Sequence, residues 1–301
     1  MPREFFENLV LGVQLGAVYA LIAVGYTMVY GVLRLINFAH GDVYMVGAYV
    51  GLTLAGRAGD GFARSPGGFV LLFVAAVGIC ALLGLLIERL AYRPLRTAPR
   101  ITALITAIGV SLLLEALALL FWSPAPRYFK TLFELPNQNL LGFELRGKYA
   151  VILEVSLVLM TILWFVVTRT RIGKAMRAVA YDREAAALMG INVNRVIGFT
   201  FALGSALAAA AGLLVSALLN YKIDPYAGVY PGLKAFVAAV LGGIGNIPGA
   251  VLGGLVMGIA ETFMAAGKFS NWRDAIAFVL LIAILIGRPA GLLGRAAVEK
   301  V

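Results

Sequence analysis

The sequence predicts an all-α polytopic membrane protein, and three observations predict it. Of the 301 residues, 61% are hydrophobic and only 13% are charged, and the mean hydropathy is +0.93. A soluble domain carries about 25% charged residues, so this chain has roughly half the charged surface that water requires. The 35 glycines agree, because glycine is frequent in transmembrane helices that pack closely. The same composition excludes a disordered chain.

The spacing of apolar runs predicts about nine transmembrane segments, within a range of eight to ten, in a single transmembrane domain over residues 1–301. A bilayer core of ~30 Å needs about 20 apolar residues per helix. Two regions are interrupted by polar residues or glycines: Phe38–Leu54 begins with His40 and Asp42, and Leu233–Ala266 is long enough for two segments. Six further runs are candidate spans: Leu9–Gly31, Gly68–Ile87, Ile101–Trp122, Tyr149–Thr168, Val196–Leu219 and Ala275–Gly287. The first is not expected to be a removable signal peptide, since its start is acidic as well as basic.

The basic excess predicts an orientation in the membrane rather than binding to nucleic acid. Lys and Arg number 25 against 15 Asp and Glu, but they are dispersed between apolar runs. Because cytoplasmic loops carry the excess of basic residues, we place three basic stretches in the cytoplasm. Ser123–Lys148 then lies outside, although it is also basic. The N-terminus is outside if Phe38–Leu54 crosses fully, and cytoplasmic if this segment only dips in. The three stretches are Arg89, Arg93, Arg96 and Arg100; Arg169, Arg171, Lys174, Arg177, Arg183 and Arg195; and Arg288, Arg295 and Lys300.

The cytoplasmic loop of residues 169–195 does not read as a flexible linker. Lys174–Met189 is rich in alanine and lacks internal Gly or Pro, which predicts one helix. Gly190 follows where a left-handed C-terminal cap is needed, and Asn192 or Asn194 is expected to cap the next helix. Such a helix is either a docking element for a partner groove or an interfacial helix on anionic lipid. Its expected exposed apolar residues are Met176, Val179, Leu188 and Met189.

Within this loop, Glu184-Ala185-Ala186 followed after three residues by Gly190 resembles the EAA-x3-G signature of ABC importer permeases. In those proteins the cytoplasmic helix fits a cleft on the ATPase subunit. Further stretches along almost the whole chain resemble the branched-chain amino-acid ABC transporter permease family of the Liv type. They are Tyr19–Gly31, Ile36–Asp42, Glu88–Leu95, Val240–Gly249 and Arg288–Gly294.

This resemblance implies a permease subunit in the cell inner membrane that translocates leucine, isoleucine and valine. The implied partners are two ATP-binding subunits, a homologous second permease and an extracytoplasmic substrate-binding protein. Permeases for urea or short amides share the same framework, so they are the alternative. The residues that the resemblance assigns to ATPase coupling are Glu184, Ala185, Ala186, Gly190, Arg177 and Arg183.

The ATPase that powers transport is expected on another chain. A phosphate-binding loop reads G-x-x-x-x-G-K-[ST], and the three Gly-Lys pairs of this sequence are followed by Tyr, Ala and Phe. The chain is therefore expected to bind no cofactor of its own, with ATP bound by partner subunits. An enzyme is disfavoured, because one histidine (His40) and one cysteine (Cys80) in distant spans supply neither a catalytic group nor a metal site. A channel or secondary carrier is disfavoured by the few charges within the spans.

Two glycine-rich or polar interruptions are candidates for the transport pathway. Backbone that leaves helical geometry inside a membrane must face protein or water, and one break in each half is typical of transporters built from repeats. The breaks are Asn37–Asp42 and Gly242–Pro248. Together with an acidic residue deep in a span, they give the candidate pathway residues Asn37, His40, Asp42, Glu115, Gly242, Gly243, Gly245 and Asn246.

Structural interpretations compete with each of these assignments. Asp42 can instead accept N–H bonds at a helix start, and Glu115 can accept a hydrogen bond from Ser111, one turn earlier. Glu261 likewise either faces a cavity or partner, or forms a buried structural pair or hydrogen bond. Glu88 is expected to form an ion pair beside Arg89 at the membrane edge. Most of the glycines are expected to permit close helix packing, with the spacing Gly245, Gly249 and Gly253.

Overall fold

The computed structural model describes residues 2–96, 98–129, 136–140, 143–267 and 270–294. They form helices and, within the described residues, one short antiparallel pair of strands, β1 (Gln138–Leu140) and β2 (Phe143–Leu145). This hairpin is a small departure from the predicted all-α chain. The α-helices are α1 (Pro2–Leu33), α2 (His40–Ala58), α3 (Asp60–Ala63), α4 (Pro66–Ile87), α5 (Arg100–Trp122), α6 (Gly147–Arg169), α7 (Arg171–Tyr181), α8 (Arg183–Leu188), α9 (Val193–Leu218), α10 (Val229–Gly242), α11 (Ile247–Ala266) and α12 (Ala275–Gly287).

Among the described residues, six helices are long and apolar enough to cross a membrane. Five of them, α1, α4, α5, α6 and α9, coincide with runs predicted as continuous spans. The sixth is α11, the second half of the region Leu233–Ala266, which forms two helices as predicted. α12 has the predicted bounds, but with 13 residues it is a shorter apolar helix, as is α10 with 14. The chain is therefore a multi-pass membrane protein with six long apolar helices.

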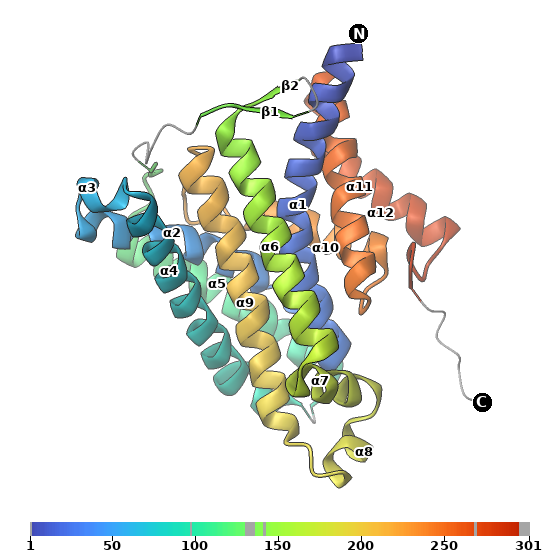
Figure 1. Ribbon diagram of the computed structural model, residues 1–301. Coiled ribbons are helices and arrows are strands. Elements are labelled where there is room, and N and C mark those ends of the chain that lie inside the picture. Colours follow the sequence, from blue (N-terminus) through green and yellow to red (C-terminus); the bar gives the residue numbers. More distant parts are fainter. Residues whose placement is uncertain (1, 97, 130–135, 141–142, 268–269, 295–301) are drawn as a thin grey trace.

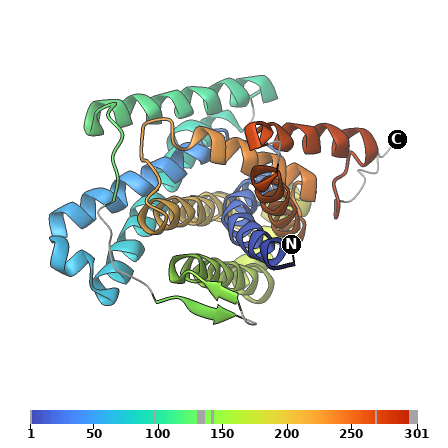
Figure 2. The ribbon, with the colours of Figure 1, turned by 90° about the horizontal axis from the view of Figure 1, so that it is seen from above.

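α1 and α9 occupy the centre of the bundle (Figure 1, Figure 2). α1 packs against α11, α9, α10 and α6, and α9 packs against α4, α2 and α1. Both central helices are mostly buried, whereas α4, α5 and α6 expose large apolar side chains, among them Leu71, Leu120 and Phe165. Continuous exposed apolar surface on outer helices is disfavoured in water and matches the lipid-facing side of a membrane bundle.

Glycines let α1 and α11 approach at backbone distance. A Cβ on Gly16 would lie 2.7 Å from the Leu255 Cα, and a Cβ on Gly258 would overlap the Gly16 backbone. The packing interpretation of the later glycines is confirmed at Gly249 and Gly253, where a Cβ would overlap α10. It is wrong for Gly245, which has open space around it and is instead held at φ 93°. This positive φ reverses the chain between α10 and α11.

The two ends of the bundle carry different elements. The N-terminal end of α1 lies beside the C-terminal end of α11, where the Phe5 and Phe263 rings are 5.2 Å apart. α7 and α8 lie at the opposite end (Figure 1). The start of α1 and the loop of residues 169–195 are thus separated by the length of the bundle.

Candidate functional site

The loop of residues 169–195 folds into two helices instead of the single predicted helix over Lys174–Met189. α7 ends at Tyr181 and α8 begins at Arg183. The break lies at Asp182, whose extended backbone and carboxylate cap the second helix. Asp182 Oδ1 accepts hydrogen bonds from the backbone N–H groups of Glu184 (2.9 Å) and Ala185 (3.0 Å). Capping satisfies two N–H groups that an isolated helix start leaves without partners, so α8 starts anew.

The two helices of this loop expose different surfaces. Met176 and Val179 of α7 are buried against the bundle, so their predicted exposure is wrong. The predicted exposure of Leu188 and Met189 is confirmed, at 89% and 82%, and Tyr181 is exposed to the same degree. The apolar surface available to a partner therefore lies on α8 and its flanks, which project beyond the bundle (Figure 1). We call Tyr181, Leu188 and Met189 the α8 tip.

Arginines fasten this loop to the ends of the long helices. Arg183 donates to the Val32 carbonyl from Nε (3.0 Å) and Nη2 (2.6 Å), and Arg177 donates to the Val167 carbonyl. Carbonyls in the last turn of a helix lack helical partners, so each guanidinium satisfies an acceptor at the end of α1 or α6. Of the predicted coupling residues, Arg177, Arg183 and the buried Ala186 hold the loop in place, whereas Glu184 and Ala185 are exposed.

The end of α8 and the start of α9 follow the predicted capping chemistry. Gly190 has φ 81°, and the Ile191 N–H donates to the Ala186 carbonyl at 3.0 Å, which closes the helix end. Asn192 caps α9 by accepting from the Arg195 backbone N–H at 3.0 Å. Asn194, the other predicted cap, accepts instead from the Arg96 guanidinium. The α8 tip therefore connects to the central helix α9 through a fixed turn.

The first predicted break brings the start of α2 against the start of α10. α2 begins at His40, and a Cβ on Gly41 would lie 2.7 Å from the Gly228 carbonyl oxygen and 3.0 Å from the Gly232 Cα. The His40 ring lies edge-on to the Tyr26 ring, with 4.6 Å between the centroids, and both residues are buried. Two helix starts thus meet beside α1 in the interior of the bundle.

The polar residues of this break are joined to other helices. Asn37 Oδ1 accepts a hydrogen bond from the Tyr92 hydroxyl at 2.9 Å, and Asp42 accepts one from the Ser111 hydroxyl of α5. The expected Ser111–Glu115 hydrogen bond is therefore replaced by a contact between helices. Ala39, the residue before α2, has no side-chain cap hydrogen bond. Asp42 accepts a hydrogen bond from its own backbone at the helix start, in addition to the one from Ser111.

The second predicted break has different neighbours. Gly243, at φ 107°, lies against the backbone of Ala290 and Gly294, and Asn246 Nδ2 donates to the Leu293 carbonyl at 2.7 Å. Asn246 also caps α11 through the Gly249 N–H. The structure thus places Gly242, Gly243 and Asn246 beside the segment that follows α12, and Gly245 near Gly31 of α1. At the first break, Asp42 lies beside Gly228 at the start of α10, whereas His40 lies against Gly25 of α1 and Gly204 of α9.

A buried ion cluster joins α1, α10, α11 and the turn before α12. Glu261, fully buried, accepts from Lys234 Nζ (2.8 Å) and Arg273 Nε (2.7 Å) on one carboxylate oxygen, and from the Tyr19 hydroxyl (2.7 Å) on the other. Lys234 Nζ also donates to Asp274 at 2.6 Å, which lowers the pKa of the Asp274 carboxyl. Each charge therefore has an opposite partner, as burial requires.

Sequence reasoning anticipated Glu261 in this cluster and missed the three other charged residues, Lys234, Arg273 and Asp274. The available signal was Lys234, a lysine inside the apolar region Leu233–Ala266, because an ionisable residue within a span has a partner or a function. Arg273 and Asp274 sit in a turn between helices, where charged residues are ordinary, and nothing in the sequence separates them from solvated ones.

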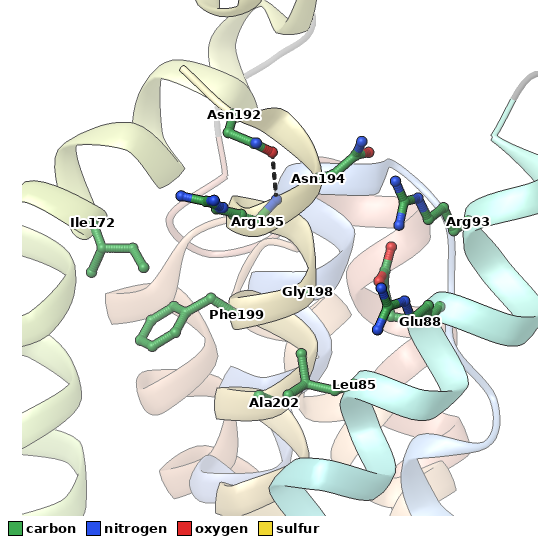
Figure 3. Close-up of a pocket in the computed structure, with 11 residues that line it drawn as sticks. Leu85, Glu88, Arg93, Ile172, Asn192, Asn194, Arg195, Gly198, Phe199 and Ala202 are labelled. Carbon is green, nitrogen blue, oxygen red and sulfur yellow. Dashed lines mark hydrogen bonds between the residues drawn. The ribbon is translucent and has the colours of Figure 1, made fainter. Parts of the chain in front are cut away.

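A second buried ion pair lies at the end of α4. The π-helical turn Glu88–Tyr92 continues α4, and Glu88 is only 4% exposed. Its carboxylate pairs with Arg96, not with the predicted neighbour Arg89. Because Arg96 also donates to Asn194, the end of α4 is tied to the start of α9. Beside this pair opens a cleft of about 570 Å³ between α4, α7 and α9 (Figure 3).

Comparison with known proteins gives one consistent family. The family described as "Branched-chain amino acid transport system / permease component" matches residues 8–285. The chain is 43% identical over 304 residues to the high-affinity branched-chain amino acid transport system permease protein LivH of Escherichia coli (strain K12), covering 99% of this chain and 98% of that protein. It is 42% identical over 309 residues to BraD of Pseudomonas aeruginosa, a protein of the same description, with both chains fully covered.

More distant similarities extend this result. The probable branched-chain amino acid transport permease protein LivH of Methanocaldococcus jannaschii is 30% identical over 292 residues, 91% of this chain and 88% of that protein. Among solved structures, PsaBC from Streptococcus pneumoniae in complex with Fab aligns with 95% of this chain and 92% of that chain. Its TM-score is 0.48 at 14% identity, a likeness too weak to place individual residues.

Proposed function

Because the chain belongs to the family of branched-chain amino acid transport permeases, we propose that it is the membrane-spanning subunit of an ABC importer for leucine, isoleucine and valine. The observation that carries this proposal is the match over 99% of the chain at 43% identity to LivH. It favours branched-chain amino acids over the alternative of urea or short amides. The chain is a transport subunit and not an enzyme.

The proposed power source is a pair of separate ATP-binding subunits that dock on the α8 tip. Two features of the loop support this role. Leu188 and Met189 are exposed beyond the bundle, while Arg183 and the buried Ala186 fix α8 to it. A partner that moves α8 would therefore move the ends of α1 and α9 as well. Glu184, beside the tip, offers a carboxylate to a basic partner site, and ATP would bind only to the partner chains.

We further propose nine membrane segments with the N-terminus outside. α2, α10 and α12 are added to the six long apolar helices, and α2 runs from the bundle interior toward the end that holds the start of α1. With the loop of residues 169–195 in the cytoplasm, the N-terminus then lies on the extracytoplasmic side of the inner membrane. A homologous second permease would pair with the exposed outer helices, and a substrate-binding protein would approach from outside.

The proposed pathway runs past the two helix breaks. α2 and α10 begin next to each other at Gly41 and Gly228, and helix starts carry partial positive charge that suits the carboxylate of an amino acid. Cysteines placed at Asn37 or Gly245 should react with a small aqueous thiol reagent, and the reaction should change when the ATPase is trapped with nucleotide. Cys80, fully buried on α4, is the internal control. Inert cysteines at both positions in every nucleotide state would contradict this pathway.

The transport activity itself is tested in proteoliposomes that contain this chain, its partner permease, the ATP-binding subunits and the binding protein. We expect uptake of labelled leucine, isoleucine and valine that requires ATP and is absent with a non-hydrolysable analogue. Labelled urea and acetamide should not accumulate. Uptake of urea in place of leucine would contradict the substrate, and leucine uptake without ATP would contradict the ABC mechanism.

A further inference from the structure

The cleft beside the Glu88–Arg96 pair combines a basic mouth with apolar walls. It lies between the end of α4, the start of α7 and the start of α9, and Figure 3 shows Arg93 and Arg195 on either side of Asn194 at its rim. The apolar side chains Leu85, Phe199 and Ala202 lie deeper in the same view. Arg89 also lines the cleft. This cleft is separate from the α8 tip and from the helix breaks of the proposed pathway.

The cleft carries positive charge that no acidic side chain among the described residues neutralises. Glu88 is neutralised by Arg96, so three cations remain. Arg89, Arg93 and Arg195 are exposed, and within the described part of the chain no side-chain hydrogen bond or ion pair joins any of them to another residue. The start of α9 is already capped by Asn192, so the attraction for an anion comes from these guanidinium groups, which bind phosphate well.

The depth of the apolar walls distinguishes a lipid from a soluble anion. Ala202 lies seven residues beyond Arg195 along α9, about 10 Å deeper at 1.5 Å per residue. Leu85 lies four residues before Arg89, about 6 Å deeper by the same measure. With the loop of residues 169–195 in the cytoplasm, as in the proposed orientation, the arginines would sit at the cytoplasmic membrane surface, where anionic lipid headgroups concentrate. The walls below them would then enter the hydrocarbon, which a soluble protein or a free phosphate ion does not fill.

We propose that this cleft binds one anionic phospholipid of the cytoplasmic leaflet. The phosphate diester is held by Arg89, Arg93 and Arg195, and the first part of an acyl chain lies against Leu85, Phe199 and Ala202. Since Ile172 of α7 also lines the cleft, the bound lipid contacts both the loop of residues 169–195 and the central helix α9. The lipid would thereby stabilise the packing of α7 against the bundle.

The test uses the full chain, stripped of lipid in detergent and titrated with phosphatidylglycerol, phosphatidylcholine or glycerol phosphate, with binding read by native mass spectrometry. The variant Arg89→Gln/Arg93→Gln/Arg195→Gln should bind phosphatidylglycerol at least about tenfold more weakly than wild type. The variant Arg57→Gln/Arg64→Gln/Arg127→Gln removes three exposed arginines that do not line the cleft, in the last turn of α2, directly after α3 and in the loop after α5, and should bind it normally. Ala202→Phe, which fills the apolar wall without changing the charge, should also weaken binding.

Three outcomes would overturn the proposal. Equal binding of phosphatidylcholine and phosphatidylglycerol by wild type would remove the role of the arginines. Displacement of the lipid by glycerol phosphate at equal concentration, with Ala202→Phe unaffected, would identify a free phosphate site. Unchanged phosphatidylglycerol binding by the triple cleft variant, with lost binding of the ATP-binding subunits, would assign the arginines to a protein interface.

Discussion

Two regions of the bundle use charge in opposite ways. Beside Tyr19, midway along α1, Lys234 and Glu261 neutralise each other inside the protein, and the more exposed Arg273 and Asp274 complete the set. At the end that holds α7 and α8, Arg177 and Arg183 bind backbone carbonyls, and the apolar α8 tip is left exposed. The first arrangement fixes helices relative to each other. The second fixes a short helix while keeping its outer surface free, which is what a docking element requires.

The largest effect on stability is expected from Lys234→Met. Glu261 would keep Arg273 and Tyr19 but lose the buried cation that links it to Asp274, and breaking a buried ion pair costs about 3–5 kcal/mol. The melting temperature of the purified protein in detergent should fall strongly. Lys222→Met, which removes an exposed lysine from its pair with the partly buried Asp224, should leave it unchanged.

The double variant Lys234→Met/Glu261→Gln sharpens this test. It removes both buried charges and keeps an oxygen acceptor for Tyr19, so part of the lost stability should return. Melting temperatures that fall additively in the double variant would show that the two side chains do not stabilise each other in the folded protein.

The next largest effect is expected from Gly258→Ala, because a methyl group there would overlap the Gly16 backbone. Separating α1 from α11 to admit it should cost about 1–3 kcal/mol. Gly78→Ala is the matched control, since Gly78 is also helical but a methyl group added there would meet nothing within 4 Å. Equal melting temperatures for the two variants would contradict the close approach of α1 and α11.

A smaller effect is expected at the turn after α8. Gly190 has φ 81° and open space around it, so Gly190→Ala meets only the conformational penalty of about 1 kcal/mol. Hydrogen exchange should increase at residues 182–192 and stay unchanged in α1 and α9. Hydrogen exchange in this segment should be slower in the Gly190→Asn variant than in the Gly190→Ala variant, because Asn tolerates the left-handed conformation. The reverse order would contradict the turn geometry.

Local chemistry was predictable from the sequence where neighbouring residues decide the structure. Gly190 closes α8, Asn192 caps α9, and the glycines from Gly242 to Gly245 separate two helices, because each depends on backbone groups within a few residues. The break at Asp182 was missed for a related reason. The alanine-rich residues on both sides of Asp182 predict a continuous helix. In the structure α7 packs against the bundle, and Asp182 caps a new helix instead of continuing the first one.

The partners of buried polar groups were not predictable from spacing. Glu88 pairs with Arg96 and not with adjacent Arg89, and Ser111 donates to Asp42, 69 residues away, and not to Glu115 one turn along. Neighbours on one helix compete with partners from other helices, and helix packing decides between them. The neighbours of the two breaks, both candidates for the pathway, likewise come from packing between helices and differ from one break to the other.

The most direct test of the difference between the two regions is ATP hydrolysis by the reconstituted complex, stimulated by the loaded binding protein. Leu188→Ser/Met189→Ser should leave the melting temperature unchanged, because both side chains are almost fully exposed. We expect it to lower the stimulated ATPase rate at least about tenfold, the effect of truncating central apolar residues of an interface. The swap Leu188→Met/Met189→Leu keeps the tip apolar and should retain stimulation. Full stimulation of the serine variant would contradict the assignment of α8 as the contact that couples the motor to the bundle.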